Sequence, residues 1–244
     1  SNPARSQWEG AFADAEPGWH KPVTVTGLKL TGDDKENYSI PVEYMTSATI
    51  TIIELTVSGI TANDKTYDGN TDATLDSEYS LEGIVPGDEV YLVPATWEGT
   101  FADAAPGDEP KLVTVTGLDL DGANKDKYTV LPYTTTATIS KKELTVSGID
   151  ALDREYDGTT VAELGSEYSL EGIVVIDGVE ETVTLDTTDS STWKGSFADA
   201  DAGVEPKLVT VTGLEPTGED GGNYIVAPYT TEATISPKEL TVRD

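Results

Sequence analysis

Residues 112–118 read Leu-Val-Thr-Val-Thr-Gly-Leu, and this stretch decides the fold. Its last six residues recur unchanged at 23–28 and at 209–214. Valines alternate with threonines in each copy, which is the pattern of a β-strand with one buried face. A stretch that recurs at a long, nearly fixed period indicates a modular array. The chain is therefore predicted to consist of β-rich repeats.

The repeat extends in both directions from this stretch. A Trp-x-Gly-x-Phe-Ala-Asp segment precedes it and starts at Trp8, Trp97 and Trp193, which lie 89 and 96 residues apart. A Glu-Leu-Thr-Val segment follows it at 54–57, 143–146 and 239–242. A module of this length buries roughly 60 to 70% of the surface that its unfolded chain exposes. It is therefore expected to fold without a metal or a disulfide, and the chain contains no cysteine.

Alternating strands and turn residues predict the fold class. Sequences such as Asp68-Gly69 and Pro106-Gly107 separate the strands, no amphipathic helix is evident, and about seven strands fit in each module. These features predict an all-β chain of tandem immunoglobulin-like antiparallel β-sandwich repeats. At three places a tyrosine precedes an inward aliphatic residue by two positions, which resembles the tyrosine corner of immunoglobulin-like sandwiches; these tyrosines are Tyr38, Tyr128 and Tyr224. Modules with a β-grasp-like sheet are the alternative, because alternation does not determine strand order.

The domain boundaries follow from unequal counts of two segments. Tyr-Asp-Gly occurs only twice, at 67–69 and 156–158, whereas the Trp-to-Val stretch occurs three times. We therefore predict a partial module at 1–53, a complete module at 54–142, and a complete module with the start of the next junction strand at 143–244. The chain begins inside a repeat and is expected to be a piece of a longer protein. The partial module is expected to expose apolar strand surface and to be completed by parent sequence or by strand-mediated self-association.

Net charge limits the expected partners. Fifteen basic and 45 acidic side chains give a net charge of −30, which repels nucleic acid and anionic membrane surfaces. No apolar run approaches the roughly 20 residues that a membrane-spanning helix needs. Neither nucleic-acid binding nor membrane insertion is expected.

The order of the motifs resembles a known family. Tyr-Asp-Gly, Phe-Ala-Asp, Val-Thr-Val-Thr-Gly-Leu and Leu-Thr-Val follow one another as in the YDG-type repeats of bacterial cell-surface, adhesin-like proteins. The resemblance covers nearly the whole chain, although the first copy lacks the Tyr-Asp-Gly half. It implies a secreted, modular protein at the bacterial cell surface or cell wall, whose partners include adjacent repeat modules of the same parent protein. It supplies no catalytic or binding residues.

Aromatic side chains are the first candidate site. Trp97, Gly99 and Phe101 share one face of a predicted strand, and the same positions recur in the other copies. They are expected to be core, with glycine making room for the rings, rather than a sugar-stacking surface. Trp19 occurs in one copy only and is the better candidate for an exposed aromatic residue.

Polar motifs give three further candidates. The Tyr-Asp-Gly triplet is expected to be a buried tyrosine that leads into a turn rather than a catalytic pair. A loop rich in oxygen ligands is expected to be a solvated turn rather than a calcium site; its candidate ligands are Asp119, Asp121, Asn124 and Asp126. Isopeptide bonds are disfavoured, because Lys127 replaces an asparagine in one copy; the candidate partners are Lys111, Lys207, Asn37 and Asn223.

Catalysis is not expected. His20 is the only histidine, and without cysteine the usual nucleophile pairs and transition-metal sites lose their support. We predict no catalytic residue, no metal site and no cofactor. The favoured function is a non-catalytic structural or adhesive module that acts as an elongated stalk or spacer. The alternative is a ligand-binding module that recognises host glycan or protein.

Overall fold

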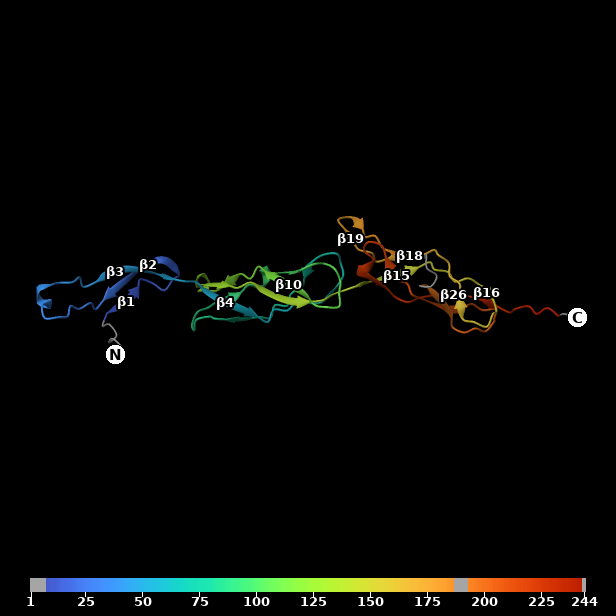
Figure 1. The fold of residues 1–244 in the computed structure, drawn as a ribbon, viewed down its shortest axis with the longest axis horizontal. Coiled ribbons are helices and arrows are strands. Elements are labelled where there is room, and N and C mark those ends of the chain that lie inside the picture. Colours follow the sequence, from blue (N-terminus) through green and yellow to red (C-terminus); the bar gives the residue numbers. More distant parts are fainter. Residues whose placement is uncertain (1–7, 187–192, 243–244) are drawn as a thin grey trace. The chain divides into compact units, whose positions relative to one another are not determined.

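The structure is a computed structural model that describes residues 8–186 and 193–242 (Figure 1). It divides into two compact units: Ser1–Thr61 with Leu75–Glu98 and Val115–Thr134, and Ala62–Thr74 with Gly99–Thr114 and Thr135–Asp244. Residues 53–140 are called the first full repeat below, and residues 142–236 the second full repeat.

Short strands and 3-10 helices make up the regular structure of the described residues. The first unit holds β1 (Glu9–Phe12), β2 (Gly18–Thr26), β3 (Tyr44–Ile50), β4 (Ile53–Ser58), β7 (Ser80–Glu82), β8 (Tyr91–Leu92), β11 (Leu120–Asp121), β12 (Tyr128–Val130), η1 (Lys35–Asn37), η2 (Pro94–Thr96) and η3 (Lys125–Lys127). Three strands carry residues of each unit, namely β9 (Glu98–Phe101), β10 (Lys111–Thr116) and β13 (Tyr133–Ala137).

The second unit holds the remaining elements. They are β5 (Lys65–Thr66), β6 (Asp72–Ala73), β14 (Ile139–Ser140), β15 (Lys142–Ser147), β16 (Arg154–Glu155), β17 (Val161–Ala162), β18 (Ser169–Glu171), β19 (Val175–Ile176), β20 (Val179–Glu180), β21 (Thr184–Leu185), β22 (Lys194–Phe197), β23 (Lys207–Thr212), β24 (Pro216–Thr217), β25 (Tyr224–Val226), β26 (Tyr229–Ala233), β27 (Ile235–Ser236) and η4 (Gly221–Asn223). The prediction of about seven strands per module was too low for the second full repeat, which holds β15 to β27.

Two sheets pack face to face in the second full repeat. One has the order β18-β15-β25 and the other β17-β22-β23-β26. Alternation turns Val146 of β15 and Val211 of β23 inward, and both belong to one buried cluster with Ile149, Leu185 and Leu214. In the first unit, Val57 of β4 and Val115 of β10 lie in the equivalent cluster. The predicted all-β, immunoglobulin-like sandwich is confirmed, and the described residues do not adopt the β-grasp alternative.

The first strand of each full repeat pairs with two neighbours. Residues 142–144 of β15 run parallel to β25, and residues 145–147 run antiparallel to β18. β4 behaves in the same way, parallel to β12 and then antiparallel to β7. The antiparallel sandwich thus also contains short parallel pairings, which the sequence did not predict. Pairing between a first and a late strand depends on tertiary placement and leaves no trace in local alternation.

Residues 8–50 form a separate sheet with the order β1-β2-β3. Phe12 is 39% exposed, whereas Phe101 and Phe197 at the same motif position are each 2% exposed. Tyr38 is 70% exposed, whereas Tyr224 is 1% exposed. Apolar side chains are thus exposed in residues 8–50. The boundaries at 53/54 and 142/143 stay predictions.

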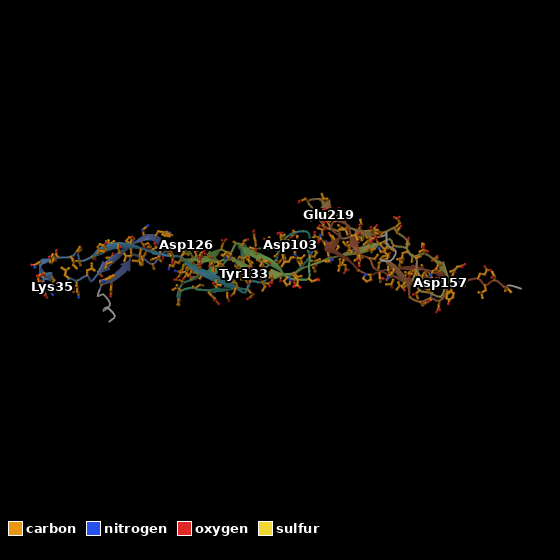
Figure 2. The ribbon with its side chains drawn as sticks, viewed as in Figure 1. Lys35, Asp103, Asp126, Tyr133, Asp157 and Glu219 are labelled. Carbon is orange, nitrogen blue, oxygen red and sulfur yellow. The ribbon has the colours of Figure 1, made fainter. Side chains whose placement is uncertain are left out.

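Acidic side chains lie on the surface of the described residues, among them Asp103, Asp126, Asp157 and Glu219 (Figure 2). One ion pair of this surface joins Lys111 Nζ to Asp103 Oδ1 at 2.8 Å. In the parts of the chain that the structure covers, no helix is long and apolar enough to cross a bilayer.

Candidate functional site

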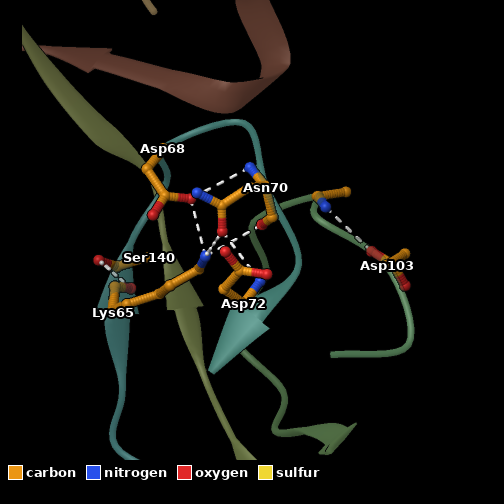
Figure 3. A network of polar contacts seen from close by, with 7 residues as sticks. Lys65, Asp68, Asn70, Asp72, Asp103 and Ser140 are labelled. Carbon is orange, nitrogen blue, oxygen red and sulfur yellow. Dashed lines mark hydrogen bonds and ion pairs between the residues drawn. The ribbon is translucent and has the colours of Figure 1, made fainter. Parts of the chain in front are cut away.

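The Tyr-Asp-Gly turn of the first full repeat is held by one lysine (Figure 3). Lys65 Nζ donates to Asp68 Oδ1 at 2.7 Å, to Asn70 Oδ1 at 2.8 Å and to the Asn70 carbonyl at 3.0 Å. Its ammonium also lies 5.6 Å from the centroid of the Phe101 ring. Gly69 takes φ +82°, which is a conformation that glycine adopts without strain. One cation therefore closes the turn.

The carboxylate of this turn stays charged over a wide pH range. Partial burial raises the pKa of Asp68, but the hydrogen bonds from Lys65 and from the Asn70 N–H outweigh it, so the net pKa is lowered. The Asp68 carboxylate therefore stays ionised and hydrogen-bonded within the turn. It is not poised as a proton donor or acceptor near neutral pH.

The second full repeat builds the same turn with an arginine in place of the lysine. Arg154 replaces the lysine, and its guanidinium pairs with Asp157 Oδ1 at 2.5 Å and donates to the Thr159 carbonyl at 2.5 Å. It lies 5.3 Å from the centroid of the Phe197 ring. Because lysine and arginine both serve, the turn needs a cation and a carboxylate, which is a structural requirement.

Tyr67 of the first turn reaches into the second full repeat. Its hydroxyl donates to Glu181 Oε1 at 2.5 Å, and the hydroxyl of Tyr224 donates to the other oxygen of the same carboxylate. The two phenol rings meet edge to face, with centroids 5.7 Å apart at 84°. Val174 N donates to the Tyr224 hydroxyl at 3.0 Å. We call Val174, Glu181, Tyr224 and the β19–β20 hairpin the platform.

Gly69 makes the second contact with the platform. A Cβ on this glycine would lie 2.9 Å from Ile176 Cδ1 and 3.0 Å from Val174 Cγ1. The bare backbone of the turn is thus needed for close approach as well as for its positive φ. The tyrosine and the glycine of the motif both contact the next repeat, and the aspartate fixes the turn that presents them.

The platform changes the ionisation of its tyrosines. Burial, followed by the hydrogen bond to Glu181, raises the pKa of Tyr224 to about 12. The same two causes raise the pKa of Tyr67 well above its ordinary value. Both effects disfavour a phenolate beside a carboxylate in a dry site.

An alkaline titration follows from these shifts. Tyr224 titrates near 12 in the folded chain and near 10 when unfolded. Its contribution of about 3 kcal/mol is complete below pH 10 and is lost as the pH rises through 12. Denaturant unfolding should show that the free energy of unfolding falls less between pH 9 and pH 12 in Tyr224→Phe than in the parent chain. The control Tyr38→Phe should match the parent, and an unchanged loss in Tyr224→Phe would contradict the assignment.

The Tyr-Asp-Gly prediction was partly right. A buried tyrosine that leads into an Asp-Gly turn is present in the first full repeat, where Tyr67 is 5% exposed. In the second, Tyr156 is 42% exposed. Burial of this tyrosine therefore comes from another repeat and not from its own core. The motif alone gave no signal of this.

The tyrosine-corner prediction found buried tyrosines but not their partners. Tyr128 donates to Asp88 Oδ2 at 2.6 Å and accepts from Val85 N at 3.1 Å. A tyrosine corner bonds to backbone only a few residues upstream, whereas these partners lie about 40 residues away. In both full repeats the tyrosine forms a carboxylate pair, which sequence spacing did not predict.

The Trp-Gly-Phe residues lie in the core of the full repeats, as predicted. Phe101 and Phe197 are buried, and the half-buried Trp97 and Trp193 pack edge to face on neighbouring tyrosines, with centroids 5.6 and 5.9 Å apart. Trp19 is 84% exposed, as predicted.

The side chains of the oxygen-rich loop, residues 119–126, form hydrogen bonds and an ion pair within the protein. Asp121 Oδ1 accepts the Gly122 N–H at 2.8 Å and pairs with Lys125 at 3.4 Å. Asn124 Oδ1 accepts the Glu89 N–H at 2.9 Å. Within the described ranges, no three His, Cys, Asp or Glu residues group as metal ligands. Asp119 and Asp126 are not brought into such a group.

The lysines considered for isopeptide bonds pair with aspartates. Lys111 Nζ lies 2.8 Å from Asp103 Oδ1, and Lys207 Nζ lies 2.5 Å from Asp199 Oδ1. The asparagine candidates Asn37 and Asn223 end the 3-10 helices η1 and η4.

His20 is exposed in β2 with φ +51°. These residues show no arrangement for covalent or acid–base chemistry.

Sequence reasoning missed Glu181 and the hairpin beside it. Trp97 and Trp193 lie seven residues further apart than Trp8 and Trp97, and the extra length falls between Tyr168 and Trp193. The hairpin β19–β20 and Glu181 lie in this segment. The unequal spacing of the tryptophans is the signal in the sequence that points to this segment.

One groove lies on the second full repeat. It has a volume of about 600 Å³ and is lined by residues 160–166 and 193–196, which include Trp193. The lining combines backbone of β17 and β22 with few charged groups. The lining offers apolar surface beside the polar side chains of Glu163, Ser166 and Lys194.

Comparisons with known proteins place the chain in a family. Residues 51–137 and 140–232 each match the model of the YDG domain. No curated protein matches the chain. One similar solved structure is the three N-terminal domains of the Highly Immunogenic Outer Capsid protein (Hoc) of bacteriophage RB49, with a TM-score of 0.31, 11% identity, and 98% of this chain and 91% of that chain covered. Another is Drosophila N-cadherin EC1-3, with a TM-score of 0.20, 9% identity, and 98% and 92% covered.

Likenesses as weak as these two carry no argument, so the fold rests on the strand pairing described above. The two stretches matched by the family model cover most of the sequence and contain both Tyr-Asp-Gly turns. The chain therefore belongs to the YDG domain family.

Proposed function

We propose that the chain is a non-catalytic structural or adhesive repeat array of a bacterial surface protein, in which YDG modules act as a stalk or spacer. The observation that carries the proposal is the contact of one repeat with the next through Tyr67, Glu181 and Tyr224. A spacer requires neighbouring modules that resist bending. Side-chain contacts at the junction supply such resistance in addition to the chain itself.

The covalent junction supports the same proposal. β14 ends at Ser140 and β15 begins at Lys142, so a single residue separates the last strand of one repeat from the first strand of the next. A connection of this length leaves little slack between modules. The acidic surface, with a net charge of −30, favours solubility outside the cell and disfavours collapse of the array on itself.

Small-angle X-ray scattering tests the spacer role. The expected result is the distance distribution of an elongated particle that stays the same from low to moderate salt. A compact, near-spherical distribution would contradict the proposal. Surface display of the chain below a reporter domain gives a second test, because a spacer should raise the reporter's accessibility in proportion to repeat number.

Ligand binding is the second candidate, favoured by the groove beside Trp193 and by the exposed Trp19. Aromatic rings next to backbone polar groups suit sugar or peptide ligands. A glycan and matrix-protein array should then give hits that Trp19→Ala or, at the exposed groove residue Ser166, Ser166→Trp abolishes. No hits with folded protein would remove this candidate and leave the spacer role intact.

Strand-mediated self-association through residues 1–53 is part of the same proposal. The sheet β1-β2-β3 exposes Trp8, Phe12 and Tyr44, which are 51, 39 and 57% exposed. Apolar strand surface of this kind recruits a partner. Sedimentation velocity should show concentration-dependent association that Phe12→Lys weakens, and a monomer at all concentrations would contradict it.

A further inference from the structure

The two Tyr-Asp-Gly turns are built alike but are covered differently. Each turn has a cation paired with the aspartate, Lys65 with Asp68 and Arg154 with Asp157. Each central glycine takes φ +82°. The tyrosine of the first turn, however, is 5% exposed and that of the second is 42% exposed. Two turns of the same construction, of which only the first is covered, indicate a docking element that is occupied in the first full repeat and open in the second.

The glycines report the same difference. A Cβ on Gly69 would meet Ile176 and Val174 of the platform within 3.0 Å. A Cβ on Gly158 would meet only the hydroxyl of Tyr156, at 3.9 Å, among the described residues. The second turn therefore keeps a bare, accessible backbone next to an exposed phenol.

The platform likewise has a counterpart. In the first full repeat, Tyr128 and Asp88 form the same tyrosine–carboxylate pair at 2.6 Å, and a valine N–H bonds the phenol in both repeats. Burial, followed by the hydrogen bond to Asp88, raises the pKa of Tyr128. Asp88 accepts no second phenol among the hydrogen bonds of the described residues, whereas Glu181 accepts two. Each full repeat thus has a turn and a tyrosine–carboxylate pair, and the second adds the hairpin.

We propose that Tyr156, Asp157 and Gly158 form a docking site for the platform of a further YDG module. The partner is defined by chemistry: a glutamate at the position of Glu181, a tyrosine at the position of Tyr224, and an aliphatic hairpin like β19–β20. Its glutamate accepts the Tyr156 hydroxyl, and its hairpin packs on the Gly158 backbone. This deepens the proposed array function and rests on it only in requiring that YDG modules contact one another.

The hairpin makes the site selective. β19–β20 supplies Ile176, which packs on Gly69, whereas the platform of the first full repeat has Pro86-Gly87 in the shorter segment between its valine and its carboxylate. A platform with the hairpin should therefore cover the second turn better than a platform without it. The turn would then distinguish among module types as well as join them.

The test uses the full chain extended by one module. Residues 142–236 are placed again after Pro237, with Tyr156→Phe in the added copy, so that only the original Tyr156 is reported. Tyrosine nitration by tetranitromethane, read by peptide mass spectrometry, measures exposure of each phenol. In the unextended chain Tyr156 should be nitrated and Tyr67 protected. In the extended chain, protection of Tyr156 should reach the level of Tyr67.

Two variants and one control make the outcome decisive. Ile176→Asp in the added copy changes an exposed hairpin residue and should restore nitration of Tyr156. An added copy of residues 53–140, which lacks the hairpin, should protect it less. Tyr224 must stay unmodified throughout, which reports that the added module is folded. Equal nitration of Tyr156 with and without the added module would overturn the docking site, and the scattering test of the spacer role would be unaffected.

Discussion

Phe197→Ala should lower the free energy of unfolding of the second full repeat by about 3 to 5 kcal/mol. The ring is 2% exposed and lies in a cluster with Ala162, Val209, Ala233 and Ile235. It also carries the guanidinium of Arg154 on its face, 5.3 Å from the centroid. Truncation removes the apolar contacts, leaves a cavity and deprives the turn cation of its support.

The matched control is the same motif position in the first copy. Phe12 is 39% exposed in the sheet β1-β2-β3, so Phe12→Ala should change stability by less than about 1 kcal/mol. Guanidinium unfolding followed by tryptophan fluorescence measures both variants, because Trp193 lies in the second full repeat and Trp8 and Trp19 lie on either side of Phe12 in the sequence. Equal effects of the two substitutions would mean that residues 8–50 bury their aromatic residues as the full repeats do.

Gly117→Ala should be the most damaging single-methyl change in the first unit. Gly117 takes φ +68°, and a Cβ there would lie 1.9 Å from the Thr96 carbonyl oxygen and 2.9 Å from its carbon. Left-handed backbone costs a non-glycine residue about 1 to 2 kcal/mol, and the clash with backbone must add to this. A loss above about 3 kcal/mol is expected, which is large for one methyl group.

Gly87→Ala separates strain from clash. Gly87 also has positive φ, +99°, but a Cβ there meets nothing within 4 Å. Its cost should stay within the strain of about 1 to 2 kcal/mol. Chemical denaturation followed through Trp97 compares the two variants. If both cost the same, close approach of Thr96 to Gly117 is not a requirement of the fold.

Local pattern in the sequence was enough to predict most of the sandwich. Alternation placed Leu144, Val146, Val113 and Val115 on buried faces, and they are 1, 7, 0 and 4% exposed. Period-two alternation reports which face is buried, because a pleated strand sends successive side chains to opposite sides. It does not report which strand lies next to which. The parallel pairing of β15 with β25 was missed for that reason.

The candidate site was less predictable, because its partners come from one repeat only. The Tyr-Asp-Gly motif identified the turn, and Asp68 with Gly69 behaves as turn chemistry requires. Ile176 lies in a hairpin that the first full repeat lacks, and Glu181 stands where that repeat has Asp88. Comparison of copies finds what is common to them, so a contact made by unique residues stays invisible to it.

The central claim is that the Tyr-Asp-Gly turn joins consecutive YDG repeats. Nitration of the unextended chain tests it most directly, since Tyr67 and Tyr156 have the same motif position and differ in exposure, 5 against 42%. The account predicts that Tyr156 is modified while Tyr67 is protected, and that Glu181→Ala makes Tyr67 reactive. Nitration of Tyr67 and Tyr156 at the same rate in the parent chain would contradict it.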